Sequence, residues 1–535
     1  MKRYLSAVFV FVLLGAAMLP SAGARSEGAP AQSDIRFGPA TGGTPGPITG
    51  AAAEAIRSGP LPADRGEYDR AKERAAARFH PESTESGGGS PPPTLGKSKQ
   101  GLFDATRTPS DSTGAIGTQR YVETVNSQVG IYDRSLNLIN QDTLVNWWAQ
   151  PGSNSFDPQV IWDPTTNRFY YAGDSVFSST DNRLSFGFSK TAAPNNATSD
   201  WCHYQVAYGA SFPDYPKLGD SKFFVIIGVN VFTGGTFSGS DILAIGKAPP
   251  GTTCPDASTF EFGIEQDIMV GADVQFTPVP ANEIDTNKNG WVLSRPAALP
   301  ADDLGRFKVS RNSTTGNPII QNPGTPIAVA SYTLPPNAPQ KDGTFNLDTS
   351  DARLTQAVAA VDPSRDRKLH VWTQHAIAGG AGSRERWYEV NPAAATVARS
   401  GTVQHDSLYV FNGAISPDRV VNGTTRAFGR NMVLGFSTSS ATTYPAIRMV
   451  GRRGNDPTSG FVLVKNSPGH NEDFGCPVNG FCRWGDYSAA TPDPKADVSK
   501  ATGRIYLSNM WTADADTTGG TSGASWRTWN WAARP

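Results

Sequence analysis

The stretch Asp157-Pro158-Gln159-Val160-Ile161-Trp162-Asp163-Pro164 decides the fold, because the chain repeats its pattern. An arginine and an apolar run follow it at 168–171. Variants of the phrase, each with a first strand, a polar turn and a second strand, occupy 214–227, 356–372 and 486–507. Strand units that recur at intervals of tens of residues are typical of a β-propeller, in which several sheets surround a central channel.

The whole region from 119 to 535 has this character and shows no helix pattern of any length. A strand pair at 121–125 and 128–132 either makes a seventh blade or closes the last blade. Roughly 415 residues suit six or seven blades of about four strands each. The sequence therefore predicts an all-β protein, a six- or seven-bladed β-propeller. Inner strands are expected to begin near Asp157, Asp214, Asp273, Gln356, Ser407 and Asp486.

Two segments of different character precede this region. Basic residues at 2–3, an apolar stretch over 8–19 and small residues at 22–24 are typical of a signal peptide over 1–24. The apolar stretch is shorter than the about 20 residues of a membrane span, so we expect a secreted protein, extracellular or periplasmic. Residues 25–118 are rich in Gly, Pro, Ser and Ala, which indicates a disordered arm with a short helix over 67–79. The arm is a pro-segment, a cell-wall spacer or a tail without a dedicated role.

Charge and cysteine content narrow the function classes. The formal net charge of −1 argues against nucleic acid as a partner, and we expect a monomer. The four cysteines fit an oxidising compartment and allow three pairings, of which we favour Cys202–Cys254 and Cys476–Cys482. A zinc site is disfavoured, because zinc usually takes closer ligand pairs in each half of its site.

Carboxylates at the starts of inner strands are the first candidate site. Asp157, Asp214 and Asp486 lie six or seven residues ahead of a turn aspartate, and Gln356 takes the equivalent place in a fourth repeat. Equivalent positions of a propeller converge at one mouth of the channel, where carboxylates could bind a cation or act on a sugar as acid and nucleophile or base. The alternative is that each aspartate accepts hydrogen bonds from backbone amides of the neighbouring blade.

Three aromatic residues lie beside these carboxylates in the sequence: Tyr215, Tyr487 and Trp484. Sugar binding uses aromatic faces next to polar groups, which would make these residues part of a ligand-binding mouth. An aromatic residue on a strand also serves for packing between blades, and this alternative stays open for Trp484.

A second candidate site is a calcium loop at 285–290. Asp285, Asn287 and Asn289 place oxygen ligands at alternate positions, and Gly290 supplies the turn. No helices flank the loop, so it would be a Ca²⁺ loop of the β-hairpin type. The alternative is an ordinary polar hairpin turn rich in Asn and Gly.

Four further stretches carry a resemblance to a known family, at 184–189, 212–219, 444–452 and 483–488, and two of them overlap copies of the repeat. With the phrase at 155–164, they resemble secreted bacterial sialidase-like β-propeller proteins of uncharacterised function. The resemblance covers about residues 120 to 535 and implies a propeller fold. The repeated Ser-x-Asp-x-Gly-x-x-Trp boxes of true sialidases are absent from the sequence.

Two function classes follow from these observations. The first is an extracellular binding module that takes a carbohydrate or a surface partner at the propeller mouth. The second is a glycoside hydrolase or lyase that uses the carboxylates at the inner-strand starts. We favour binding, because catalysis needs a defined pair of groups with separated pKa values, whereas the repeat offers several equivalent aspartates.

Overall fold

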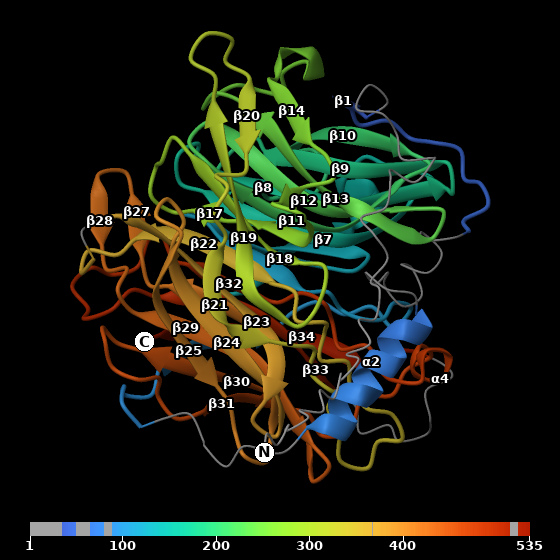
Figure 1. Ribbon diagram of the computed structural model, residues 1–535. Helices are drawn as coiled ribbons and strands as arrows, with labels where there is room; N and C mark the ends of the chain where they lie inside the picture. Colours follow the sequence, from blue (N-terminus) through green and yellow to red (C-terminus); the bar gives the residue numbers. More distant parts are fainter. Residues whose placement is uncertain (1–34, 50–64, 80–87, 366, 514–522) are drawn as a thin grey trace, which may run out of the picture.

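The computed structural model is an all-β, seven-bladed β-propeller, and it describes residues 35–49, 65–79, 88–365, 367–513 and 523–535. Figure 1 shows the sheets arranged around the centre of the molecule. In blades 1 to 4, the first strand of each is innermost. Blade 1 consists of β3 (Thr113–Ile116), β4 (Arg120–Val125), β5 (Gln128–Asp133) and β6 (Leu138–Thr143), and blade 2 of β7 (Asn154–Asp163), β8 (Arg168–Ser178), β9 (Asp181–Ser189) and β10 (Trp201–Gly209). Blade 3 consists of β11 (Phe212–Asp220), β12 (Phe224–Thr233), β13 (Thr236–Gly246) and β14 (Phe262–Glu265). Blade 4 consists of β16 (Asp273–Pro280), β18 (Gly290–Pro296), β19 (Ala301–Arg311) and β20 (Pro318–Gln321), with β15 (Met269–Val270) and β21 (Ile327–Tyr332) at its edges.

Blades 5 to 7 complete the ring, in which β3 contacts β7 on one side and β32 on the other. Blade 5 consists of β22 (Gln356–Val361), β23 (Leu369–Gly379), β24 (Gly382–Asn391) and β25 (Thr396–Val403), with β17 (Asn282–Glu283) parallel to β22. Blade 6 consists of β26 (Tyr409–Pro417), β29 (Met432–Ser440), β30 (Thr443–Arg452) and β31 (Val462–Asn466), with the hairpin β27 (Val420–Asn422) and β28 (Thr425–Ala427) beside it. Blade 7 consists of β32 (Ala489–Pro492), β33 (Ile505–Thr512), β34 (Trp526–Arg534) and β2 (Thr94–Gln100). The helices are α2 (Arg65–Arg78), α3 (Leu144–Trp147), α4 (Cys476–Asn479) and the 3-10 turn η1 (Ala257–Thr259).

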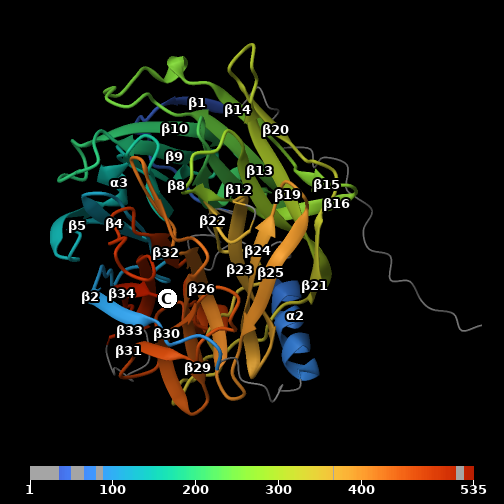
Figure 2. The same cartoon turned by 90° about the vertical axis from the view of Figure 1, so that its left-hand side faces the viewer.

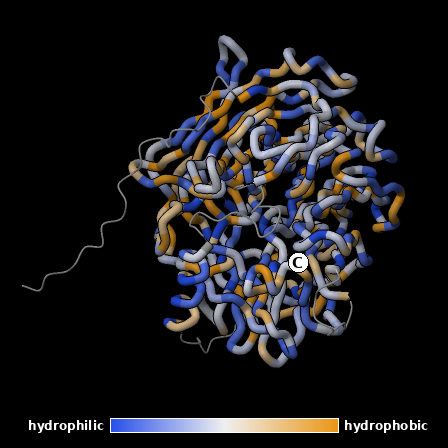
Figure 3. Tube along the Cα trace, turned by 90° about the vertical axis from the view of Figure 1, so that its right-hand side faces the viewer, coloured by the Kyte–Doolittle hydropathy of each residue, from blue (hydrophilic) through white to orange (hydrophobic). Residues whose placement is uncertain are grey.

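The core lies between the blades, because each sheet buries both of its faces. In β12, Val225 and Ile227 pack towards blade 2, whereas Phe224 and Ile226 pack towards blade 4. Side chains alternate between the faces of a strand, so a continuous apolar run fills two interfaces at once. Figure 3 shows apolar segments interspersed with polar ones along the chain. No helix within the described ranges is both long enough and apolar enough to cross a bilayer.

The strand pair expected at 121–125 and 128–132 forms β4 and β5 of blade 1. The last blade is instead completed by an earlier segment of the chain. β2 pairs with β34 as the outermost strand of blade 7, with Thr94 opposite Arg534. The propeller thus draws on residues within the expected arm over 25–118: β1 (Arg36–Pro39) extends blade 2 beside β10, β3 is the innermost strand of blade 1, and α2 corresponds to the expected short helix. A Gly- and Pro-rich segment can do this because an outermost strand contributes mainly backbone hydrogen bonds, which cover an exposed sheet edge. The expected signal peptide at 1–24 lies outside the described residues.

Both expected disulfides are present, Cys202–Cys254 and Cys476–Cys482. The turn aspartates also act as the turn chemistry indicates. The backbone amides of Thr165 and Lys495 donate to Asp163 and Asp493, respectively, each at 2.8 Å. These carboxylates therefore hold the hairpins of the repeat.

Candidate functional site

Four inner strands share a bulge at the mouth end of the channel. β7, β11, β16 and β26 each shift register at a residue with a positive φ: Asp157 (53°), Tyr215 (57°), Thr277 (53°) and Asn412 (51°). A proline or glycine follows each of them. A bulge of this kind bends the strand and redirects its side chains.

The bulge corrects the alignment of the repeats. Tyr215, not Asp214, is the counterpart of Asp157, because both carry the positive φ at the register shift. Asp214 corresponds to Phe156, the last paired residue before the shift. Counting from the turn aspartate missed this difference, since the spacing from the bulge to the turn differs between the two strands. The mouth therefore holds an asymmetric group of polar residues and not a ring of equivalent carboxylates.

The structure nonetheless brings five of the predicted residues together. The Tyr487 hydroxyl donates to Asp157 Oδ2 at 2.8 Å, and the Tyr215 hydroxyl donates to the Asp486 carbonyl at 2.6 Å. The two tyrosine rings lie with their centroids 4.6 Å apart. Asp214 is buried nearby and close to Asp157. We call Asp157, Asp214, Asp486, Tyr215 and Tyr487 the mouth cluster.

Five charged residues that the sequence did not single out join the mouth cluster. Lys217 Nζ lies over the rings of Tyr215 and Tyr487, 4.0 and 3.7 Å from their centroids. Arg483 forms an ion pair with Asp486, whose backbone amide donates to Asp111 at 2.6 Å. Proximity in sequence could have suggested Lys217 and Arg483. The additional residues are Asp111, Asp174, Lys217, Arg353 and Arg483.

Burial dominates the electrostatics of this group. Burial, followed by the charge of Asp486, raises the pKa of Asp111 to about 8 and that of Asp157 to about 6. Burial, followed by the charge of Asp157, raises the pKa of Asp174 and of Asp214 well above the ordinary value. Burial and the nearby Arg353 lower the pKa of Lys217. Removing a charge from water favours its neutral form, and these directions follow from that cost.

Two predicted residues have packing roles. The Gln356 amide group bridges to Ala490, donating to its carbonyl at 2.5 Å and accepting from its backbone amide at 3.0 Å. Trp484 is buried and donates through Nε1 to Ser437 Oγ at 2.8 Å, with its ring edge-to-face against Phe411. The Gln356 contact joins the inner strands of blades 5 and 7, which are not neighbours, and the Trp484 contacts join the segment before β32 to blade 6.

The space inside the channel is small. A cavity of about 30 Å³ is lined by inner-strand residues that include Gln159, Lys217 and Gln356. A volume of this size holds about one water molecule. The carboxylates of Asp157, Asp214 and Asp486 do not line this cavity, and the side chains of Asp157 and Asp214 are buried.

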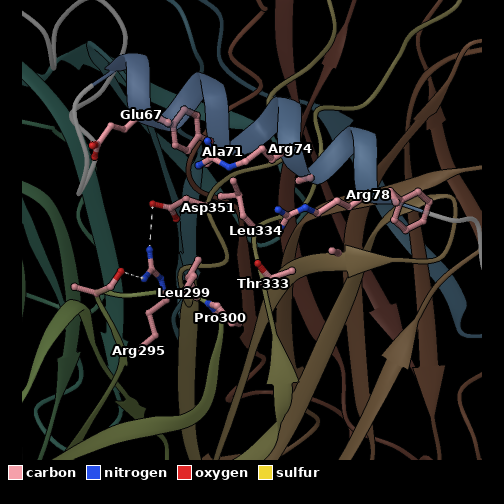
Figure 4. A pocket seen from close by; sticks show the side chains of 15 residues that line it. Glu67, Ala71, Arg74, Arg78, Arg295, Leu299, Pro300, Thr333, Leu334 and Asp351 are labelled. Atoms are coloured by element: carbon pink, nitrogen blue, oxygen red, sulfur yellow. Dashed lines mark hydrogen bonds and ion pairs between the residues drawn. The ribbon is translucent and has the colours of Figure 1, made fainter. Parts of the chain in front are cut away.

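A larger pocket of about 400 Å³ lies on the same face, between α2 and blades 4 and 5 (Figure 4). Its walls include the ends of β18 and β23, and Pro296 of β18 pairs with Gln275 near the start of β16. The pocket therefore opens at the mouth end of the channel. Leu299, Pro300 and Leu334 supply apolar lining. Figure 2 shows α2 outside the sheets.

Polar contacts seat α2 on the loop at 348–351. Lys72 Nζ is buried and donates to Thr349 Oγ1 at 3.0 Å and to the Ser350 carbonyl at 2.5 Å. The Tyr68 hydroxyl donates to Asp348 Oδ1 at 3.1 Å. The helix is therefore a built part of the mouth face.

A chain of charges connects this pocket with the mouth cluster. Asp351, which lines the pocket, accepts from Arg353 Nε at 2.7 Å and lies 3.5 Å from Arg295 Nη2. The Arg353 guanidinium lies 4.4 Å from the centroid of the Tyr215 ring. A ligand in the pocket would thus be separated from the mouth cluster by one layer of charged side chains.

The proposed calcium loop has its own contacts. Asp285 is engaged by Arg419, with Nη2 at 2.7 Å from Oδ1 and Nε at 3.0 Å from Oδ2, and accepts from the Val361 amide at 2.9 Å. Asn287 Oδ1 accepts from the Asn289 backbone amide at 3.2 Å. In this arrangement a calcium ion would have to share Asp285 with Arg419. Calcium binding at this loop stays a prediction.

Comparison with known proteins gives only distant likenesses. No family model and no curated protein matches the chain. The α-L-arabinanase of Penicillium chrysogenum, solved with arabinobiose, is similar at 11% identity over 69% of this chain and 99% of that chain, with a TM-score of 0.34. The Synechocystis apocarotenoid oxygenase, as a Glu-to-Asp mutant, is similar at 12% identity over 66% and 74%, with a TM-score of 0.34. A subtype N11 neuraminidase-like protein of A/flat-faced bat/Peru is similar at 9% identity over 85% and 96%, with a TM-score of 0.29. Likenesses this weak carry no argument about activity.

Proposed function

We propose that the protein is an extracellular binding module that takes an acidic carbohydrate in the pocket beneath α2. One observation carries the proposal: the 400 Å³ pocket of the mouth face has Arg74 and Arg78 in its lining, and neither forms an ion pair or hydrogen bond with a residue that the structure describes. Ligand pockets are typically a few hundred Å³ in volume and combine apolar walls with a few placed polar groups.

The chemistry of the lining suits a sugar that bears a carboxylate. Arginine binds carboxylates through two parallel charge-assisted hydrogen bonds. Phe79 and Pro300 offer apolar surfaces to the faces of a sugar ring. Figure 4 shows Arg74 and Arg78 along the side of α2 that borders the pocket. A uronic-acid oligosaccharide presents both features, a planar anion and a ring with an apolar face.

The geometry favours binding over hydrolysis or elimination at the mouth cluster. Glycosidases place two carboxyl groups on either side of a glycosidic bond, so the sugar must lie between them. Asp157 and Asp214 are instead both buried, with a carboxylate oxygen of each within 4.8 Å of the other. The hydrolase or lyase alternative requires that the mouth open before a sugar can enter.

Retention on immobilised polysaccharides tests the proposal. We expect the protein to bind polygalacturonate and alginate at 0.15 M salt, and to bind neutral xylan and mannan at least tenfold more weakly. The double substitution Arg74→Ala and Arg78→Ala should weaken binding to the acidic polymers by at least tenfold. Arg70→Ala is the matched control, because Arg70 is exposed on the same helix but does not line the pocket.

Two results would contradict the binding proposal. Equal retention of the double variant and the Arg70→Ala control would exclude the pocket as the binding site. Release of sugars by the wild-type protein, abolished by Asp157→Asn, Asp214→Asn or Asp486→Asn, would establish the enzyme alternative in its place.

A further inference from the structure

Three buried carboxylates meet between blades 2 and 3, and none of them belongs to the pocket beneath α2. Asp157 lies on the bulge of β7, Asp174 on β8 and Asp214 on β11. One carboxylate oxygen of each lies within 4.8 Å of the corresponding oxygens of the other two, and all three side chains are buried. Asp174 was not a candidate in the sequence, because it lies in the middle of an apolar second strand.

The protein itself supplies almost no partners for these oxygens. Asp174 is completely buried, and neither of its oxygens has a hydrogen-bond partner among the described residues. Asp214 likewise has no side-chain hydrogen bond or ion pair within the described part of the chain, although it is 3% exposed. Asp157 accepts one hydrogen bond, from the Tyr487 hydroxyl. The side chain of Asp174 thus points, without a partner, at the other two carboxylates.

The neighbouring cations are engaged elsewhere. Arg483 pairs with Asp486, and Arg353 pairs with Asp351. Lys217 Nζ lies over the rings of Tyr215 and Tyr487, 4.0 and 3.7 Å from their centroids. Among the described residues, no cation forms an ion pair with Asp174 or Asp214, and the charges of Arg353 and Arg483 act on Asp214 only from a distance.

Burying ionised carboxylates without a counter-charge costs several kcal/mol per group. Two states avoid this cost: the carboxyls hold protons, or a cation binds between them. Oxygen atoms are the ligands of hard cations, and calcium accepts several carboxylates in flexible geometry, whereas magnesium usually keeps much of its water. A buried set of three carboxylates therefore suits calcium better.

We propose that Asp157, Asp174 and Asp214 bind one calcium ion between blades 2 and 3. The ion would join the two blades by bridging β7, β8 and β11, and would stabilise the folded state by mass action. The remaining ligands would be water or main-chain oxygens. This site is separate from the loop at 285–289 and from the pocket beneath α2.

Thermal unfolding of the full chain at pH 7.5, first stripped with EDTA and then titrated with CaCl₂, tests the site. We expect the midpoint to rise with the logarithm of free calcium, and terbium bound at the site to show luminescence sensitised by Tyr215 and Tyr487. Asp174→Asn should abolish both effects. This variant is expected to fold, because an amide of nearly the same shape removes one buried charge, and in EDTA it should be at least as stable as the wild type.

Asp285→Ala separates the two calcium sites and should leave the calcium-dependent shift in place. The shift should also shrink at pH 5, where protons compete for the three carboxylates. Absence of any calcium shift in the wild type would overturn the proposal. A shift that survives Asp174→Asn but is lost in Asp285→Ala would overturn it too, and would assign calcium to the loop at 285–289.

Discussion

Replacing Lys247 with methionine tests whether the turn aspartates of the repeat hold blades 2 and 3 together. Lys247 Nζ lies 2.7 Å from Asp163 Oδ2 and 2.7 Å from Asp220 Oδ2. Asp163 ends β7 and Asp220 ends β11, so one ammonium group joins the inner strands of two blades. The lysine side chain is 4% exposed, and those of the two aspartates are 0% and 1% exposed, which leaves no water to replace the cation.

The size of the effect follows from this burial. Removing one partner of a buried ion pair costs about 3–5 kcal/mol, because the remaining charge is left uncompensated. The Thr165 amide still donates to Asp163 and the Glu283 amide to Asp220, so we expect the lower end, about 3 kcal/mol at pH 7.5.

The penalty should depend on pH. Burial already raises the pKa of Asp220 to about 6, and loss of the ammonium group raises it further. The folded variant therefore takes up one proton more readily than the wild type as the pH falls. Between the pKa of Asp220 in the variant and its pKa in the wild type, each fall of one pH unit should reduce the stability cost of Lys247→Met by about 1.4 kcal/mol.

Urea unfolding followed by tryptophan fluorescence at pH 7.5 and pH 5.5 measures both quantities. Lys222→Met is the control, because Lys222 is exposed near the same turn. Adding Asp220→Asn to Lys247→Met should recover part of the lost stability. The reasoning is refuted if Lys247→Met costs no more than the control, or if its cost is the same at both pH values.

Three further predictions concern the mouth, the helix and a disulfide. The pKa of Asp111 is raised from an ordinary 3.8 to about 8 in the folded protein, so the wild type should lose stability as the pH rises between these two values. Thermal midpoints measured between pH 6 and 8 should fall less steeply for Asp111→Asn than for the wild type, and an equal slope would contradict the prediction. Lys72→Ala removes the buried contacts that seat α2, so a Glu-specific protease should cleave after Glu73 about tenfold faster, whereas Arg70→Ala should not change the rate; equal rates would refute the docking role. Replacing Cys202 and Cys254 with alanine opens a loop of 52 residues and should lower the free energy of unfolding in urea by about 4 kcal/mol; an unchanged free energy would contradict the prediction.

The sequence was sufficient to predict the architecture because strand alternation and turn chemistry are local. The phrase at 157–164 and its copies fall on inner strands and their hairpins, and the expected all-β propeller is confirmed with seven blades. The blade count stayed open because closure depends on β2, which lies in a segment of low-complexity composition. A strand recruited only through backbone hydrogen bonds leaves little trace in its side chains.

The mouth was predictable only in part. Asp157, Asp214 and Asp486 do meet there, but the bulges of β7 and β11 lie at different distances from the following turn, so Tyr215 is the counterpart of Asp157. Asp174 could not be found, because a single aspartate in an apolar strand has no sequence pattern that shows what lies opposite it across a blade interface. Long-range contacts of this kind are set by tertiary geometry and not by periodicity.

The pairing of β2 with β34 also fixes the order in which the molecule can be completed during synthesis. Thr94–Gln100 is made early but finds its partner only when Trp526–Arg534 has been made. The contact from Asp111 to the Asp486 backbone joins chain segments that are almost as far apart. A chain interrupted before Trp526 therefore leaves β33 with an unpaired edge and the ring open. An unfinished copy therefore exposes an edge of β33 that the finished protein pairs with β34, and this edge distinguishes the two for quality control.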